Sequence, residues 1–329
     1  MFFLRGGTPF SLPLQTSGSS ATSFGAEFFL WEAEILSKNG LVWKKSCIFV
    51  VEKPDDSSKN YVFVKQVRPK KNLGQHFLTD LTIARRIADT VDACPDLPVL
   101  EVGPGMGVLT QYLAEKTRPL RVVEIDAESV EYLYEHFPRL HDNIIGEDFL
   151  KMDLRTLFDG GQFVLTGNYP YDISSQIFFK MLDNRDFIPC CTGMIQREVA
   201  QRMAAVPGSK QYGILSVLVQ AWYDVEYLFT VEPGVFNPPP KVQSAVIRMT
   251  RNEVRQLGCD EELFKRVVKT TFNQRRKMLR VSLRQLLPAE APIFTEQATL
   301  LTRRPEQLSI QEFVELTNLV AKVLFSHTK

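Results

Sequence analysis

Between about residue 99 and residue 168, short apolar runs alternate with amphipathic stretches along the chain. The apolar runs have the length and composition of buried strands. We expect helices after the first two runs, ending near Lys116 and Phe137. The predicted strands lie within the segments VLEVG, RVVEID, NIIGED and QFVLTGN. This alternation predicts an α/β fold, with a mostly parallel, Rossmann-like sheet that carries helices on both faces.

The pattern changes in the second half of the chain. Helices are predicted near 174–182, 199–205 and 212–222, with a strand at 192–196. The segments DVEYLFTVEP and SAVIRMTR then have the character of two strands with no helix between them, because three consecutive prolines interrupt their connection. Two strands joined in this way predict an antiparallel pair at the end of the sheet.

After Arg251 only helical patterns remain, near 261–272, 277–286 and 310–325, and they predict a small all-helical domain. We therefore divide the chain into an N-terminal extension, an α/β domain and a helical domain, at residues 1–60, 61–251 and 252–329.

The N-terminal extension carries no sustained period of either strand or helix. Its start, MFFLRGGTPFSLPL, is similar to a targeting peptide, but Arg5 and Pro9 interrupt it and no basic region leads it. Two interpretations stay open: a genuine additional segment, and translation from a start codon upstream of the true one.

The composition is that of a globular protein, since 44% of the 329 residues are hydrophobic and 23% are charged. Whole-chain disorder, collagen and coiled coil are thereby excluded. No run approaches the roughly 18 apolar residues that a membrane span requires, so we expect a soluble protein with no membrane partner. The five cysteines have neither metal-ligand nor disulfide-framework spacing, which indicates a cytoplasmic protein without a metal site.

The net charge of +1 conceals an uneven distribution. Residues 264–284 contain eight cations and no acid. A run of charge usually covers a solvated face, but this excess is more than solubility requires and favours binding to nucleic-acid phosphates. A smaller basic run is placed to guide a nucleic-acid strand; it comprises Lys65, Arg68, Lys70 and Lys71.

A glycine-rich turn follows the first predicted strand, in the sequence from Glu101 to Gly107. Gly103 and its neighbours allow a tight turn and a close approach of the backbone to a nucleotide-like ligand. Glu124 ends the next strand, where a carboxylate can bind ribose hydroxyls, and Asp148 follows the third, placed to meet an adenine amine. A merely structural turn with two solvated acids, or a dinucleotide oxidoreductase, are the alternatives. The GxGxG spacing favours S-adenosylmethionine, because that ligand has no pyrophosphate to bind.

The fourth predicted strand ends in Asn168, Tyr169, Pro170 and Tyr171, which we call the acceptor tetrad. An adenine amine is a weak nucleophile, and it needs acceptors aimed at its hydrogens as it attacks a methyl carbon. The Asn168 side-chain oxygen and the Tyr169 main-chain carbonyl, held by Pro170, would supply them, and Tyr171 would stack on the base. An ordinary β-turn is the alternative. For Phe236, burial in the core and stacking on the base are equally open.

These motifs resemble those of the KsgA family of small-subunit ribosomal RNA adenine dimethyltransferases. The resemblance covers about residues 67–304 and is carried by the segments KKNLGQHFLTD, EVGPGMGVLT, VVEID, GEDFL, GNYPYDISSQIFFKML, QREVAQRM and VFNPPPKVQSAVIR. It implies a class I methyltransferase fold and dimethylation of two adjacent adenines near the 3′ end of 16S ribosomal RNA, with S-adenosylmethionine, in the assembling 30S subunit.

By motif match, the resemblance implies cofactor contacts at His76, Leu78, Gly103, Glu124, Asp148 and Asn168. Two positions depart from the family pattern. His76 replaces an asparagine, which leaves open the atom that meets the cofactor, and Tyr169 replaces a leucine, for which we expect little chemical consequence.

Three other functions remain to be weighed. The related Erm enzymes modify large-subunit RNA, and a noncatalytic RNA-binding assembly factor can keep the same fold. A nicotinamide oxidoreductase gives no account of the acceptor tetrad. We expect a monomer that acts on an unpaired or flipped adenine, because a base inside a helix is inaccessible to such a pocket.

Overall fold

The computed structural model describes the backbone of 28–36, 42–51 and 61–63, and residues 67, 69–70 and 73–325. The chain forms two compact units, Met1–Arg68 and Pro69–Lys329. The first contains an antiparallel sheet in the order β1-β2-β3. Its strands are β1 Phe28–Leu36, β2 Val42–Val51 and β3 Tyr61–Phe63. The sequence showed no strand period here, but these segments are rich in the aromatic and β-branched residues that favour strands.

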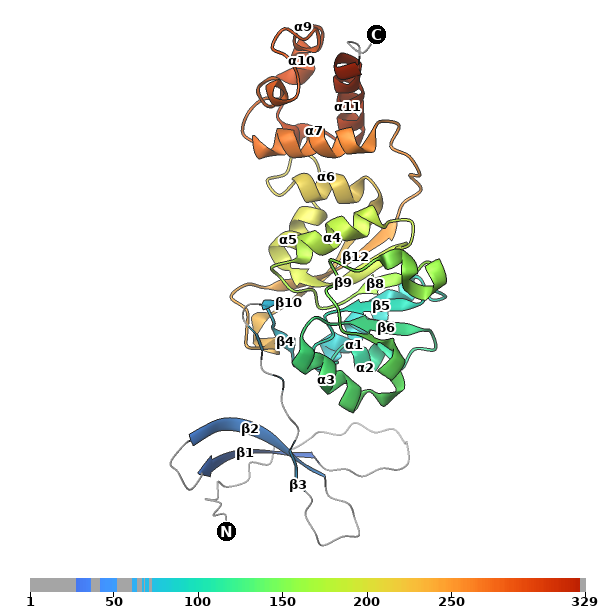
Figure 1. Ribbon diagram of the computed structural model, residues 1–329. Coiled ribbons are helices and arrows are strands. Elements are labelled where there is room, and N and C mark those ends of the chain that lie inside the picture. Colours follow the sequence, from blue (N-terminus) through green and yellow to red (C-terminus); the bar gives the residue numbers. More distant parts are fainter. Residues whose placement is uncertain are drawn as a thin grey trace. The chain divides into compact units, whose positions relative to one another are not determined.

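The second unit is built on a seven-stranded sheet in the order β10-β12-β9-β8-β5-β6-β7 (Figure 1). The five strands from β9 to β7 are parallel, and β10 and β12 form the antiparallel pair predicted at one end. The strands are β5 Val99–Val102, β6 Leu120–Val123, β7 Ile144–Ile145, β8 Val164–Thr166, β9 Cys190–Gln196, β10 Tyr223–Val231 and β12 Ser244–Arg251. The Rossmann-like fold is thus confirmed.

Alternate strand residues supply the two faces of this sheet. Val99 belongs to one core cluster, whereas Leu100 belongs to the other. Helices α1, α2 and α3 cover the first face, and α4, α5 and α6 cover the second (Figure 1). These helices are α1 Leu81–Asp89, α2 Thr110–Leu113, α3 Ala127–His136, α4 Ser174–Asp183, α5 Arg197–Met203 and α6 Ile214–Gln220.

Three local features differ from the sequence predictions. Helix α2 is a single turn, because Gly105 and Gly107 have positive φ and delay the start of helical geometry. Helix α1 was not predicted. A two-stranded antiparallel sheet, β4 Phe77–Leu78 with β11 Phe236–Asn237, was missed because it joins distant segments. Short 3₁₀ helices complete the connections: η2 Thr90–Ala93, η3 Pro138–Asn143, η4 Leu154–Gly160 and η5 Pro233–Val235.

The C-terminal part is helical, as predicted. Its elements are α7 Glu261–Asn273, α8 Leu279–Ser282, η6 Leu283–Gln285, α9 Ile293–Glu296, α10 Ala298–Leu301, η7 Pro305–Gln307 and α11 Ile310–Phe325. The Asp260 carboxylate caps α7 by accepting the Leu263 N–H. The apolar stripe of α7 joins the core cluster above the sheet, so the helical part packs directly on the α/β part. Among the described residues, no helix is long and apolar enough to cross a membrane.

Candidate active site

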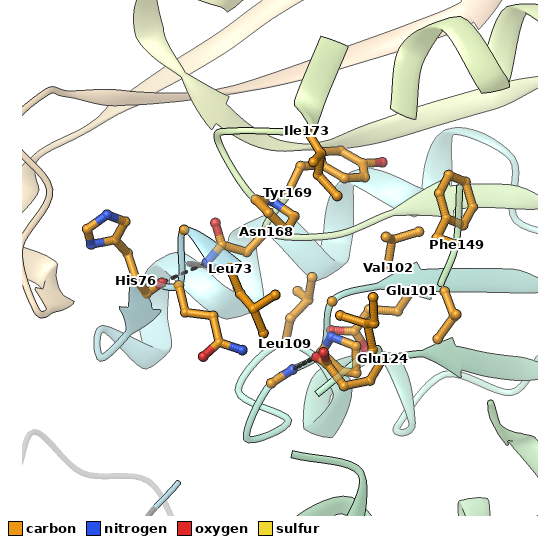
Figure 2. A pocket seen from close by; sticks show the side chains of 18 of the residues that line it. Leu73, His76, Glu101, Val102, Leu109, Glu124, Phe149, Asn168, Tyr169 and Ile173 are labelled. Carbon is orange, nitrogen blue, oxygen red and sulfur yellow. Dashed lines mark hydrogen bonds between the residues drawn. The ribbon is translucent and has the colours of Figure 1, made fainter. Parts of the chain in front are cut away.

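A pocket of about 240 Å³ lies at the carboxyl ends of the parallel strands (Figure 2). Its lining includes all six residues predicted to contact a cofactor: His76, Leu78, Gly103, Glu124, Asp148 and Asn168. The rest of the acceptor tetrad lines the same pocket. Phe236 does not. The structure therefore brings the predicted residues together, although their individual roles stay predictions.

The glycine turn gives the pocket its closest backbone. Gly105 has a φ of +55°, and a Cβ there would stand 2.9 Å from Cε1 of Phe77. Gly107 has a φ of +76°, and its Cβ would stand 2.3 Å from Cε2 of Phe137. Side chains are excluded at both positions by conformation and by space. The turn consequently presents main-chain N–H groups rather than side chains.

Glu124 is only 4% exposed and organises this turn. One carboxylate oxygen accepts the Gly105 N–H at 3.0 Å (Figure 2). The other accepts the Asp126 N–H at 2.9 Å. Burial raises the pKa of Glu124, and these backbone donors oppose the rise. Each oxygen keeps a lone pair that a ligand hydroxyl can use.

Glu101 also lines the pocket, although the sequence analysis assigned it no role. It is 1% exposed and accepts a hydrogen bond of 2.7 Å from the Thr110 hydroxyl. Burial is the main reason that the pKa of Glu101 rises to about 8. Its place at the end of β5, inside the glycine motif, was the available signal.

Asn168 faces the wall of the pocket formed by residues 73–78, which we call the N-terminal wall. Its amide nitrogen donates to the His76 carbonyl at 3.1 Å. Because a carbonyl only accepts, this bond fixes the amide orientation and leaves the side-chain oxygen on the opposite side (Figure 2). The His76 ring donates from Nδ1 to the Pro238 carbonyl at 2.8 Å and lies 5.5 Å from the Tyr171 ring. Nε2 is therefore the ring nitrogen that His76 leaves for a ligand.

The Tyr169 side chain points into the core and is 1% exposed. Its hydroxyl donates to the Thr192 carbonyl at 2.8 Å, and its N–H donates to the Met194 carbonyl at 3.0 Å. The ring has room because a Cβ on Gly193 would stand 2.7 Å from it. Burial raises the pKa of Tyr169 well above its usual value of 10. The larger side chain thus anchors the tetrad to β9 and leaves the main-chain carbonyl as its chemical contribution.

The two aromatic residues proposed to hold the base differ in position. Tyr171 is half-buried beside the pocket, and its hydroxyl bonds to that of Ser244. Phe236 is 4% exposed and pairs with Leu78 across the β4–β11 sheet, within a hydrophobic cluster. Phe236 is therefore buried in the core, which is one of the two alternatives. Its stacking on a base stays a prediction.

Lys70 connects the segment before β4 to the start of α3, just after Glu124. Its ammonium bonds to Asp126 and lies 3.4 Å from Glu128. Lys70 is thereby paired within the protein while its side chain stays 33% exposed, and its part in guiding nucleic acid stays a prediction. The other members of that basic run, Lys65, Arg68 and Lys71, lie outside the described residues.

Known proteins share this sequence and geometry. A family model described as "Ribosomal RNA adenine dimethylase" matches residues 66–322. The chain belongs to that family. "Ribosomal RNA small subunit methyltransferase A" of Phocaeicola vulgatus is 69% identical over 262 residues, covering 80% of this chain and 93% of that protein. The protein of the same name from Bacteroides fragilis is 70% identical over 261 residues, covering 79% and 95%.

Two solved structures resemble the dimethylase. A dimethyladenosine transferase from Plasmodium falciparum superposes with a TM-score of 0.62 at 23% identity, covering 75% of this chain and 97% of that one. The 23S rRNA methyltransferase ErmE superposes with a TM-score of 0.55 at 27% identity, covering 74% and 99%. The first likeness supports the fold alone, and the second also places Erm enzymes among the relatives.

The pocket suits the cofactor of this family, S-adenosylmethionine. When bound, that molecule supplies a methyl group on a positively charged sulfur. The dimethylase pocket combines buried carboxyl groups, Glu101 and Glu124, with the apolar side chains of Leu78 and Phe149. The carboxyl groups offer hydrogen-bond acceptors to a ligand that carries hydroxyls, and the apolar walls favour a purine ring.

The basic run of the dimethylase divides into engaged and free cations. Lys265 pairs with Asp183 at 3.1 Å, Lys269 stacks over Phe179, and Arg275 donates to the Ser209 carbonyl. Five others are exposed and form no ion pair with any described residue: Arg266, Arg276, Lys277, Arg280 and Arg284. The last four lie in the segment from the end of α7 through η6, which also carries the exposed side chains of Met278 and Val281. We call these four cations the basic face.

Proposed function

We propose that this dimethylase transfers two methyl groups to the N6 amine of each of two adjacent adenines near the 3′ end of 16S ribosomal RNA. The supporting observation is the acceptor tetrad, whose Asn168 amide is oriented by His76 at the edge of the cofactor pocket. The small-subunit choice rests on relatives about 70% identical that are named for the small subunit. We further propose that the enzyme is a cytoplasmic monomer acting on the assembling 30S particle.

In this reaction the protein positions the reacting groups and supplies hydrogen-bond acceptors. At the first transfer the Asn168 side-chain oxygen and the Tyr169 carbonyl accept hydrogen bonds from the two N–H groups of the adenine amine, and at the second transfer one N–H remains to be bound; these bonds let the nitrogen develop its lone pair. In each transfer the new N–CH3 bond would form as the methyl–sulfur bond breaks, and the nitrogen would then release one proton to solvent. The Tyr169 anchor on β9 holds the carbonyl still, and Tyr171 offers a ring face to the base. Fixing amine and methyl donor within attack distance contributes roughly 7 to 11 kcal/mol at best.

The basic face is proposed to bind RNA phosphates. Its cations are exposed and unpaired within the described part of the chain, so binding does not require the loss of internal ion pairs. Its exposed methionine and valine offer apolar contact beside the charges. A dependence on salt concentration follows directly from such phosphate contacts.

One labelling experiment tests this function. The protein is incubated with labelled S-adenosylmethionine and, separately, undermethylated small-subunit particles, bare large-subunit RNA and DNA. We expect label only in small-subunit adenines, and at least a tenfold loss with Asn168→Ala, which corresponds to about 1.4 kcal/mol or more. Label in the large-subunit RNA would instead support an Erm activity. An absence of label, with particle binding retained, would support a noncatalytic assembly factor.

A further inference from the structure

Lys180 connects two walls of the pocket from outside it. It lies on α4 and is half-buried. Its ammonium donates to the carbonyl of Leu150 at 2.9 Å and to the carbonyl of Met152. It also lies 5.5 Å from the centre of the Phe149 ring. None of these partners belongs to its own helix, so the contact joins α4 to a separate loop.

That loop forms a single turn which begins at Asp148. The Asp148 carbonyl accepts the N–H groups of Lys151 and Met152, and its side chain accepts the Leu150 N–H at 3.0 Å. Asp148 and Phe149, at the start of this turn, line the pocket. The carbonyls that accept hydrogen bonds from Lys180 lie at the other end of the turn. Carbonyls at that end of a helical turn have no backbone donor. A cation is also the charge that this end of a turn favours.

Helix α4 provides the fixed side of the contact. It starts directly after the acceptor tetrad, and the Ser174 hydroxyl donates to the Tyr171 carbonyl at 3.2 Å. Three of its side chains are 0% exposed and pack in the same core cluster as Leu100 of the sheet: Ile177, Phe178 and Met181. Figure 2 shows Phe149 and Asn168 on different sides of the pocket. A side chain that bonds to the Asp148 turn from α4 therefore links the two sides.

We propose that Lys180 is a positioning residue: its ammonium fixes the turn of Asp148 and Phe149 against the helix of the acceptor tetrad, and so determines the affinity for the cofactor. This inference rests on the proposed function, in which the adenine of S-adenosylmethionine lies beside Asp148. The surroundings support it, since burial lowers the pKa of Lys180 while Asp148 and Asp153 favour its charged form. Truncation of this half-buried side chain removes both of its hydrogen bonds, and the two carbonyls lose the donor that Lys180 supplies.

The test compares two lysines near the same carboxylate. Lys180→Met removes the donor and keeps the length of the side chain. Lys151→Met is the matched control, because Lys151 lies 3.4 Å from Asp148 but is 85% exposed and donates to neither carbonyl. We expect Lys180→Met to weaken binding of S-adenosylmethionine and of S-adenosylhomocysteine equally, by about tenfold, as measured by calorimetry. At saturating cofactor its kcat stays within about threefold of wild type, and the KM for the particle is unchanged.

Variants at Lys180 and at Asp148 decide the interpretation. Lys180→Arg, which keeps a cationic donor, should recover most of the affinity, whereas a purely structural defect would not respond to the charge. An unchanged affinity in a folded Lys180→Met protein overturns the proposal, provided that Asp148→Ala weakens binding. If Asp148→Ala has no effect, the proposed adenine site is wrong instead. Should Lys180→Met fail to fold, Lys180→Gln takes its place, and an unchanged affinity there also overturns the proposal.

Discussion

The cofactor pocket and the basic face recognise their ligands by opposite means. In the pocket, two acidic side chains are buried and already hydrogen-bonded: Glu101 accepts from the Thr110 hydroxyl, and Glu124, which is 4% exposed, accepts from two backbone N–H groups. On the basic face, four cations are exposed and without ion-pair partners among the described residues. The first arrangement fixes geometry before the ligand arrives, and the second supplies charge without geometry. Single substitutions should therefore damage the pocket severely, whereas the basic face should lose function gradually and in proportion to charge.

The largest expected effect comes from removing the carboxylate that organises the glycine turn. Glu124→Ala should weaken S-adenosylmethionine binding by about 100-fold, because two backbone donors lose a charged acceptor and the ligand loses its own. Calorimetry at low and high salt should give the same loss. The exposed Glu135 of α3 provides the control, since Glu135→Ala should bind normally. If Glu124→Ala lowered the affinity for S-adenosylmethionine less than threefold, the pocket would not differ from the basic face in its sensitivity to single substitutions.

Neutralising the basic face should have the next largest effect, and it should depend on salt. The variant replaces four cations by glutamine: Arg276, Lys277, Arg280 and Arg284. We expect particle affinity to fall about tenfold or more near physiological salt, and the slope of log affinity against log salt to fall by about 3. Filter binding over a salt series measures both. Cofactor affinity should not change, and the double variant Arg139→Gln with Arg155→Gln should leave the slope almost intact.

The pH dependence of stability reports on Glu101. The pKa of Glu101 is 4.5 in the unfolded chain and about 8 in the folded protein. Between pH 4.5 and pH 8 the folded state therefore holds up to one proton more than the unfolded state. Stability therefore falls as pH rises through this window, by at most about 1.4 kcal/mol per pH unit, and levels off above pH 8. Glu101→Gln should lack this decline. Urea unfolding of both proteins at pH 5.5 and 7.5 measures the difference, and parallel curves would contradict the assigned burial effect.

The smallest effect is expected at Tyr169. Tyr169→Phe removes the hydroxyl that donates to the Thr192 carbonyl and keeps the ring beside Gly193. The free energy of unfolding should fall by about 1 kcal/mol, and kcat should change less than fivefold, because the carbonyl of residue 169 is preserved. Denaturant titration and steady-state kinetics are the measurements. A hundredfold loss of kcat would show that the hydroxyl takes a direct part in the reaction.

The sequence predicted the elements that local patterns determine. Strands with buried residues on both faces appear as continuous apolar runs, and α7 and α11 carry a helical apolar stripe, so these elements were found nearly at their observed positions. The edge of the sheet that gathers Gly103, Glu124 and Asn168 followed from the rule that parallel strands end together.

The features that were missed depend on contacts between distant segments. No local sequence pattern predicts that Phe77 pairs with Asn237, or that Lys70 bonds to Asp126. The direction of the Tyr169 side chain depended on a glycine in another strand, Gly193. Glu101 stood within the quoted motif, but its raised pKa arises from complete burial, which periodicity alone does not measure. Short-range signals thus locate the site, while tertiary packing sets its chemistry.

The β4–β11 sheet also has a consequence for the order of events during translation. Strand β4 lies early in the chain, yet its hydrogen-bonding partner is Phe236–Asn237. A nascent chain that has left the exit tunnel only as far as β9 has no partner for β4. Since domains form as units while synthesis proceeds, the N-terminal wall beside Leu78 must wait for the later segment. The growing polypeptide therefore acquires a complete binding cavity only after most of its length has emerged.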